Sequence, residues 1–244
     1  MAEAEHKTGN RRILVTRPQP GASRTAERLK AMGFEPVVLP LSRTVSLAVS
    51  LGDETFDAVT VTSANLFCHV SDDILAKLRH LPLFAVGIAT AKAAREAGFA
   101  TVIEGGGDAI RLAETIRQAL PGGARVLYLA GKVRQPVFEE RMVVAGLTMR
   151  VHDAYDIEGI TPSAAELRSL SAGAPFVAAL LYSGVAAQKF VETFAAFAPI
   201  YLKEARFLCI SRRVAGLLPP DWQARALVAD HPDEEGLFRL LSMV

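Results

Sequence analysis

A regular alternation of short apolar runs and segments with helical periodicity is the feature that most constrains the fold. Runs such as Ile13–Val15, Val59–Val61 and Val126–Ala130 are nearly continuous in apolar residues. Gly, Pro, Ser or Thr soon follows each run, and a helix-like pattern comes next. Apolar strands followed by helices are typical of parallel sheets whose two faces are both covered. The sequence therefore predicts an α/β protein with parallel sheets flanked by helices.

The two halves of the chain resemble each other. Four segments align without gaps, the last more loosely than the others: 13–34 with 126–147, 56–67 with 176–187, 83–94 with 207–218, and 101–116 with 226–241. Self-similarity of this kind indicates two related α/β units. Unrelated strand–helix chains also resemble each other, so the repeat alone leaves a true duplication open.

Composition narrows the class of protein. The chain has 244 residues, half of them apolar, and a formal net charge of +1, which argues against a nucleic-acid partner. Its two cysteines, Cys68 and Cys209, form no CxxC pair, so a disulfide framework and a structural zinc site are not indicated. The polar N-terminus lacks the apolar core of a secretory signal, and no apolar run could span a bilayer. We expect a cytoplasmic monomer with neither nucleic-acid nor membrane partners.

Small, hydroxylic or basic residues follow the predicted strands. In open α/β sheets, ligands bind beyond the carboxyl ends of the strands, where helix N-termini also present N–H groups. Few carboxylates occur in these loops, so together they suit a polyanion. The plainer alternative is that the hydroxyls cap helices and the arginines are solvated. The candidate binding residues are Arg17, Thr62, Ser63, Ala64, Gly87, Ile88, Thr90, Gly131, Lys132, Ser183, Gly184, Ser211 and Arg212.

Ser63 and Ser183 lack the surroundings of a catalytic nucleophile. Neither lies in a G-x-S-x-G turn, and none of the five histidines lies in a motif typical of a general base. The glycine-rich stretch Glu104–Asp108 lacks the patterns of nucleotide-binding loops, and no cluster has metal-ligand spacing. We therefore interpret both serines as strand-ending and helix-starting residues that present hydroxyl and N–H groups.

Tyr155 ends the apolar-polar run Met149–Tyr155, just before a segment punctuated by Gly159 and Pro162. This segment has the composition of a connection between domains. On the residues alone, packing of the ring against the connection and exposure of the phenol to a cleft are both open.

The order of short motifs resembles that of the uroporphyrinogen-III synthase family. The resemblance extends from about Ile13 to Leu241. The motifs are VTRP at 15–18, TSAN at 62–65, VGIATA at 86–91, LYLAG at 127–131, VHDAY at 151–155 and YSGVAA at 182–187.

The resemblance implies two similar α/β domains joined by a two-strand connector, with a cleft between them. The first domain would comprise 11–40 plus 156–244, and the second 43–152. It also implies cyclisation of hydroxymethylbilane, a linear tetrapyrrole polycarboxylate, with inversion of the last ring, loss of water and no cofactor. In this family pattern Tyr155 corresponds to a tyrosine that helps the hydroxyl depart.

One turn departs from the family pattern. Where a G-x-x-T turn is usual in the second half of the repeat, this chain has Ser211 and Val214, with two arginines between them. Arg212 or Arg213 could replace the lost threonine contact. Two other functions stay open from the residues alone: a non-catalytic two-domain protein that binds small anions, and a nucleotide-dependent α/β enzyme.

Overall fold

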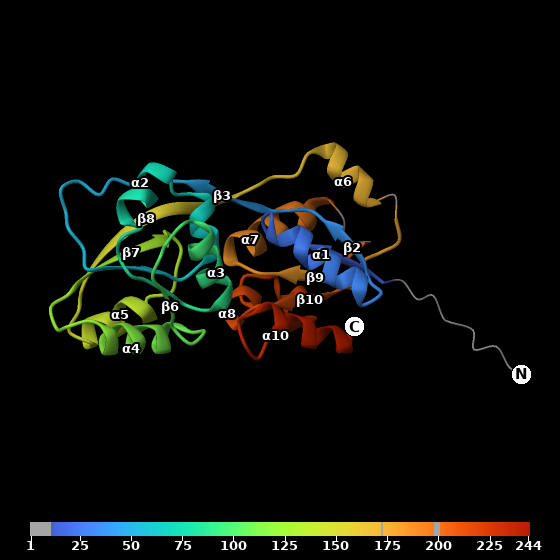
Figure 1. The fold of residues 1–244 in the computed structure, drawn as a ribbon. Helices are drawn as coiled ribbons and strands as arrows, with labels where there is room; N and C mark the ends of the chain where they lie inside the picture. Colours follow the sequence, from blue (N-terminus) through green and yellow to red (C-terminus); the bar gives the residue numbers. More distant parts are fainter. Residues whose placement is uncertain (1–10, 172, 198–200) are drawn as a thin grey trace, which may run out of the picture. The chain divides into compact units, whose positions relative to one another are not determined.

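The computed structural model describes residues 11–171, 173–197 and 201–244. The chain divides into two compact units (Figure 1). Unit 1 runs to Arg43 and resumes at Glu158–Val244, and unit 2 is Thr44–Ile157. The polar N-terminal segment for which the sequence predicts no secretory signal, residues 1–10, lies outside the described residues.

Unit 1 contains a five-stranded parallel sheet. Its strands, in order across the sheet, are β11 (Ala226–Val228), β10 (Arg206–Cys209), β9 (Ala178–Leu181), β1 (Arg12–Val15) and β2 (Glu35–Val38). The central strands are fully buried, which explains why their sequences are continuously apolar.

Helices cover both faces of this sheet, and alternate strand residues point to opposite faces. Ile13 and Val15 pack with the helices that contain Leu29 and Leu237, whereas Leu14 packs with the helix that contains Phe190. The helices of unit 1 are α1 (Gly21–Ala31), α6 (Ala164–Ser171), α7 (Gly184–Phe197), α8 (Arg212–Ala215), α9 (Pro220–Gln223) and α10 (Glu234–Arg239), followed by the 3₁₀ turn η2 (Leu240–Met243).

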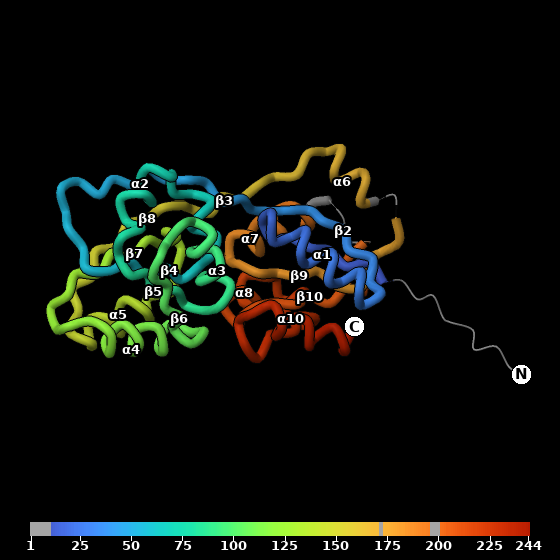
Figure 2. The backbone as a smooth tube through the Cα atoms, viewed as in Figure 1, coloured from blue at the N-terminus to red at the C-terminus, as the bar shows by residue number. Residues whose placement is uncertain are grey.

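Unit 2 contains a six-stranded sheet, and Figure 2 traces the backbone through its strands. Its strands, in order, are β3 (Ser42–Ser46), β8 (Thr148–Gly159), β7 (Arg125–Gly131), β4 (Ala58–Val61), β5 (Leu83–Ala85) and β6 (Val102–Glu104). The five strands from β8 to β6 are parallel. β3 and β8 are also the two segments in which the chain passes from one unit to the other.

The core of unit 2 again has two layers. Val59 and Leu127 pack with α2 and α3, and Ala58 and Val126 pack with α4 and α5. The helical elements are the 3₁₀ turn η1 (Ala64–Cys68), α2 (Asp72–Leu78), α3 (Ile88–Glu96), α4 (Ala109–Ala119) and α5 (Val137–Val144). In the described part of the chain, no helix combines the length and apolarity that a bilayer crossing requires.

The strand registers reproduce the repeat that the sequence indicated. Ala58 pairs with Val126 in unit 2, and the aligned residues Ala178 and Ile13 pair in unit 1. The last of the four alignments is displaced: Leu83 pairs with Val102, and Phe207 pairs with Ala226, one residue from the sequence alignment. The same alignment is correct at the following helices, where Asp108 and Asp233 both act as N-caps.

The equivalent strands give the two units the same order. Across the sheet of unit 2 the strands are β6-β5-β4-β7-β8, which is the order 3-2-1-4-5 when they are numbered along the chain from β4. Across the sheet of unit 1 they are β11-β10-β9-β1-β2. This is the same order when numbering starts at β9 and β1 and β2 count as the fourth and fifth strands. Unit 1 is thus the same fold with its last two strands supplied by the beginning of the chain. An insertion of unit 2 between β2 and β9 produces this arrangement.

Candidate active site

Tyr155 lies near the carboxyl end of β7, where β7 and β8 are irregularly paired. Gly131 pairs with Tyr155 at the shift in register. A Cβ atom at Gly131 would lie 2.7 Å from both Cε2 and Cζ of the Tyr155 ring. The half-buried ring therefore rests against the backbone of Gly131, and only glycine leaves room for it there.

Ser63, at the end of β4, lies next to the hydroxyl of Tyr155 and acts on its pKa. Burial raises the pKa of Tyr155, and the Ser63 hydrogen bond only partly opposes that change. The phenol is consequently protonated around neutral pH. It is a neutral donor at the carboxyl edge of the sheet, which is where the sequence placed the binding loops.

His69 stacks on the Tyr155 ring, with centroids 5.0 Å apart and planes inclined by 29°. Its Nδ1 lies 3.0 Å from the Ser46 hydroxyl and its Nε2 lies 2.8 Å from the Thr44 hydroxyl. Burial lowers the pKa of His69, which favours the neutral imidazole. The sequence offered no signal for this residue, because its partners lie on β3 and β8.

The turn after β4 has two hydroxyl groups with different roles. The Thr62 hydroxyl lies 2.7 Å from the hydroxyl of Tyr128, a buried residue of β7. Ser63 caps η1 by accepting a hydrogen bond from the Asn65 N–H at 3.2 Å. Ala64 is the first residue of η1. Ser63 is therefore an N-cap, as the plainer interpretation held, and it also reaches the Tyr155 phenol.

The next turn along this edge follows β5. Gly87 precedes α3 and makes no side-chain cap, so the first N–H groups of α3, from Ile88 onward, have no acceptor within the helix. Ile88 is 77% exposed and Thr90 is buried. A Cβ at Gly87 would lie 3.4 Å from Cα of Gly107, so the two glycine turns lie close together.

The cations at the end of β7 are paired with carboxylates. Lys132 forms an ion pair with Asp156 at 2.9 Å. Arg134 contacts both Asp153 and Glu139 at 2.6 Å. The sequence suggested few carboxylates at these loops; strand β8 supplies two of them from the side. Positive charge on this edge is largely neutralised.

In unit 1, Arg17 at the end of β1 faces a network around Glu234, the first residue of α10. Arg17 and Arg28 form ion pairs with the two oxygens of Glu234 at 2.9 and 2.7 Å. Thr25 and Tyr182 donate hydrogen bonds to the same carboxylate. The predicted anion-binding residue Arg17 thus already has an internal carboxylate as its partner.

The two remaining turns of unit 1 carry capping serines. Ser183 accepts a hydrogen bond from the Ala186 N–H at 3.2 Å at the start of α7, next to Gly184, and Ser211 accepts one from the Val214 N–H at 3.4 Å. Arg212 and Arg213 are exposed and form no ion pair with the described residues. Arg212, a candidate residue, and its neighbour Arg213 are therefore open to an external anion.

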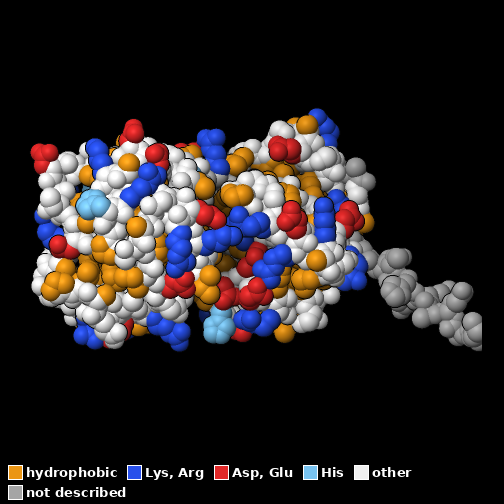
Figure 3. All heavy atoms as spheres, in the orientation of Figure 1, with side chains coloured by type: hydrophobic (Ala, Val, Ile, Leu, Met, Phe, Trp, Pro, Cys, Tyr) orange, Lys and Arg blue, Asp and Glu red, His pale blue; other side chains and the backbone are white. Residues whose placement is uncertain are grey.

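The structure thus brings most of the candidate residues to the carboxyl edges of the two sheets. The residues Thr62, Ser63, Ala64, Gly87, Ile88, Thr90, Gly131, Lys132 and Tyr155 lie in unit 2, and Arg17, Ser183, Gly184, Ser211 and Arg212 lie in unit 1. His69, Glu234, Asp153 and Asp156 are the neighbours that the sequence did not identify. Over the face drawn in Figure 3, basic and acidic side chains are interspersed.

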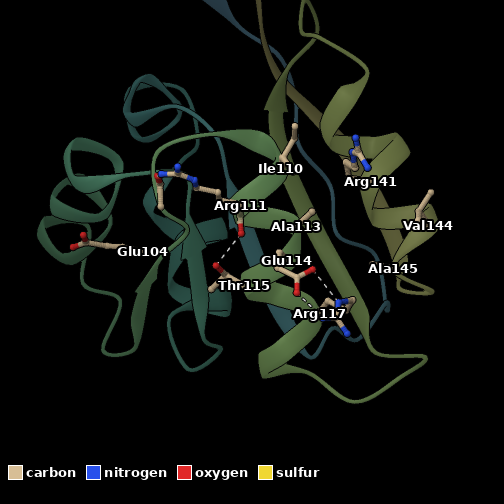
Figure 4. A pocket seen from close by; sticks show the side chains of 11 residues that line it. Glu104, Ile110, Arg111, Ala113, Glu114, Thr115, Arg117, Arg141, Val144 and Ala145 are labelled. Carbon is tan, nitrogen blue, oxygen red and sulfur yellow. Dashed lines mark hydrogen bonds and ion pairs between the residues drawn. The ribbon is translucent and has the colours of Figure 1, made fainter.

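A cavity of about 620 Å³ lies elsewhere in unit 2, along α4 and α5 (Figure 4). Its lining includes the exposed apolar residues Ile110 and Val144 and the ion pair between Glu114 and Arg117. None of the candidate residues lines it. The groove is open to solvent, so its size alone does not make it the site of chemistry.

Comparison with known proteins gives a match to one family model and to solved structures. The family model HEM4, described as Uroporphyrinogen-III synthase HemD, matches residues 23–239. No curated protein matches the chain. A crystal structure of uroporphyrinogen-III synthetase from Helicobacter pylori 26695 has a TM-score of 0.66 at 19% identity, covering 96% of this chain and 100% of that one. A mutant uroporphyrinogen III synthase from Thermus thermophilus has a TM-score of 0.46 at 16% identity, covering 95% and 97%.

The Helicobacter structure shares the fold of this chain over nearly its whole length. The family model spans most of the sequence and includes Tyr155 and the turns at Ser63, Gly87 and Ser183. The chain therefore belongs to the uroporphyrinogen-III synthase family.

Proposed function

We propose that this chain closes hydroxymethylbilane, a linear tetrapyrrole polycarboxylate, into uroporphyrinogen III by using Tyr155 as the proton donor. The family supplies the reaction: cyclisation with inversion of the last pyrrole ring and loss of water, without a cofactor. The observation that supports the role of Tyr155 is its protonated, restrained phenol at the carboxyl edge of unit 2, held by Gly131 and Ser63.

In the first step, the C–O bond of the terminal hydroxymethyl group breaks and its electrons go to the oxygen. Tyr155 donates a proton to that oxygen, which departs as water. The cation left on the pyrrole chain is stabilised by the ring nitrogen. The substituted carbon of the last ring then attacks it and forms a spiro intermediate. The bond from that carbon to its original bridging carbon breaks, and the bridging carbon bonds instead to the unsubstituted α-carbon of the inverted ring. That α-carbon releases its proton, and the phenolate of Tyr155 takes up a proton, which restores the phenol.

The remaining part of catalysis is orientation. A flexible linear substrate reaches its attacking geometry only if several carboxylates are held at once. We propose that N–H groups at Ala64, Ile88 and Gly184 bind some of them, with Thr62, Thr90, Lys132 and Ser183 beside them. Arg212 and Arg213 supply the exposed positive charge, and Ser211 positions their helix.

The internal ion pairs show that the arginines of unit 1 differ in how readily they can bind a substrate carboxylate. Arg17 is already paired with Glu234, so it binds a substrate carboxylate only by sharing or exchanging that partner. Arg212 and Arg213 have no such competitor among the described residues. The most favourable electrostatic contact with a polycarboxylate is therefore expected at α8.

We further propose that the protein acts as a cytoplasmic monomer and that its domains comprise 11–40 plus 156–244 and 43–152. The free cysteines suit a reducing compartment, and the two compact units support the division into two domains. Sedimentation equilibrium tests the monomer directly, and limited proteolysis followed by mass spectrometry tests the boundaries.

The experiment for the reaction is an isomer analysis. Freshly prepared hydroxymethylbilane is incubated with the protein, and the cyclic products are oxidised and resolved by chromatography. We expect the inverted isomer to predominate at a rate far above the spontaneous one. Formation of only the non-inverted isomer, at the rate seen without protein, would contradict the proposal.

A further inference from the structure

We infer that His69 is a positioning residue, which fixes the Tyr155 phenol in the direction needed for proton donation. The inference rests on the proposed role of Tyr155. Its basis is the stack between the two rings, together with the two hydroxyl groups that hold the imidazole in place.

An unbroken series of side-chain contacts links β3 to Tyr155. Thr44 and Ser46 are two residues apart on β3, so their side chains lie on one face of the strand. Both reach the His69 ring, and that ring lies against Tyr155 of the neighbouring strand β8. The His69 imidazole thus fixes the Tyr155 ring relative to β3.

A single short turn contacts Tyr155 from both ends. Ser63 precedes η1 and lies next to the phenol, and His69 follows η1 and stacks on the ring. Gly131 adds the close backbone contact. The ring is therefore restrained through its hydroxyl, its face and its edge, which limits the directions in which its proton can be delivered.

The hydrogen bonds also exclude a direct chemical role. Both ring nitrogens of His69 contact hydroxyl groups of β3, at 3.0 and 2.8 Å. Neither nitrogen is left to donate to, or accept from, a substrate without breaking one of these contacts. His69 accordingly acts through Tyr155, and its removal should affect the chemical step more than substrate binding.

The test is a double-mutant cycle with steady-state kinetics. We expect His69→Ala to lower kcat by roughly tenfold with KM nearly unchanged, because misplacement of a reacting group slows chemistry. His69→Phe keeps the stacked ring but loses both hydrogen bonds to β3, so it should recover only part of that loss. In a Tyr155→Phe background, His69→Ala should have no further effect on kcat. His80→Ala, an exposed histidine in the same unit, serves as the matched control.

The possible results distinguish an error in the role of Tyr155 from an error in the role of His69. Full activity of Tyr155→Phe would overturn the catalytic role of Tyr155 and this inference with it. Slow turnover by Tyr155→Phe combined with normal kcat in His69→Ala, or an additive loss in the double variant, would overturn only the role of His69. If His69→Ala does not fold, the pair Thr44→Val and Ser46→Ala releases the imidazole instead. That variant should show the same loss of kcat, in smaller degree and only when Tyr155 is present; unchanged kcat would overturn the inference.

Discussion

The two units share one strand order and one register, yet their carboxyl edges are built from different chemistry. Unit 2 presents a protonated tyrosine, glycine turns and paired cations. Unit 1 presents capping serines, an arginine bound to an internal carboxylate and two exposed arginines. We infer that unit 2 carries out the chemical step and that unit 1 contributes mainly to substrate binding.

A difference in one helix accounts for part of this contrast. In unit 1, α7 runs without interruption from Gly184 to Phe197. The aligned segment of unit 2 forms η1, breaks at His69, and begins again as α2 after Ser71. The break releases His69 toward Tyr155, whereas the aligned residue in unit 1, Lys189, remains in its helix and pairs with Glu192.

The two half-buried tyrosines also differ in their partners. Burial raises the pKa of Tyr182 to about 12, and its hydroxyl donates to Glu234 at 3.1 Å. Tyr155 has the neutral Ser63 as its partner. The Tyr182 phenol already donates its proton to a carboxylate inside the fold. The Tyr155 phenol, beside a serine, can give its proton to a departing oxygen.

The largest effect is expected from Gly131→Val, which brings side-chain atoms into the space of the Tyr155 ring. Displacing the phenol should lower kcat by about 100-fold, with the fold retained. Gly122→Ala is the matched control, because a Cβ there has no heavy atom within 4 Å. Measurement of kcat and of the far-ultraviolet circular dichroism spectrum checks both parts. Normal turnover by Gly131→Val would show that the position of Tyr155 is unimportant.

The next largest effect concerns the Glu234 network of unit 1. Burial by itself would raise the pKa of Glu234, but the Thr25 hydrogen bond and the arginines outweigh it, so the pKa is lowered. A lowered carboxyl pKa stabilises the fold above the ordinary glutamate pKa, and the stabilisation is lost as pH falls through the folded value. Glu234→Gln should therefore reduce the free energy of unfolding by about 2 kcal/mol near neutral pH, and by less in acid.

Urea unfolding of wild type and Glu234→Gln over a range of pH measures this difference. Glu114→Gln in unit 2 is the control. Arg117 lowers the pKa of Glu114 to about 2, but the pair is solvent-exposed, so water screens it and the effect on stability should be small. A Glu234→Gln effect that is the same at every pH would contradict the electrostatic account.

The capping serines Ser63 and Ser183 occupy equivalent turns in the two units. Ser183→Ala removes the cap of α7 and should lower stability by about 1 kcal/mol, with a small effect on kcat. Ser63→Ala removes a cap from a short turn and also the hydroxyl beside Tyr155. It should lower kcat more than Ser183→Ala does, at a smaller change in stability. Thermal melting and kinetics of both variants decide whether the repeats have diverged in this way; equal losses of kcat would indicate that they have not.

The smallest effect is expected at α8. Alanine at both Arg212 and Arg213 should raise KM by roughly threefold to tenfold and leave kcat nearly unchanged, because exposed charges attract a polyanion weakly and are screened by salt. The increase in KM should shrink as salt is added. Alanine at Arg117, which is paired with Glu114, is the control. A change confined to kcat would place these arginines in the chemical step.

The sequence was sufficient for the alternation, the repeat and most of the strand ends, because buried parallel strands leave a continuous apolar signal. The gapless alignments agree with the registers of these strands: Ala58 pairs with Val126, and the residues aligned with them, Ala178 and Ile13, also pair. The alignment of β6 with β11 was wrong by one residue. A short strand of three residues carries too little pattern to fix its register.

The site was less predictable, since its contacts join residues far apart in the chain. His69, on the turn after β4, stacks on Tyr155 of β8 and is held by Thr44 and Ser46 of β3. Glu234 meets Arg17 because α10 packs on the same face as α1. Strand ends identify which loops share an edge. They do not show which cations on that edge already have carboxylate partners.

The most direct test of the central claim is a comparison of Tyr155→Phe with Tyr182→Phe at saturating hydroxymethylbilane, measured as the single-turnover rate of ring closure. Each change removes one hydroxyl from a half-buried tyrosine at the carboxyl edge of one unit. We predict that Tyr155→Phe closes the ring much more slowly than wild type, while Tyr182→Phe closes it at nearly the wild-type rate. Equal rates in the two variants would contradict the assignment of the chemical step to unit 2.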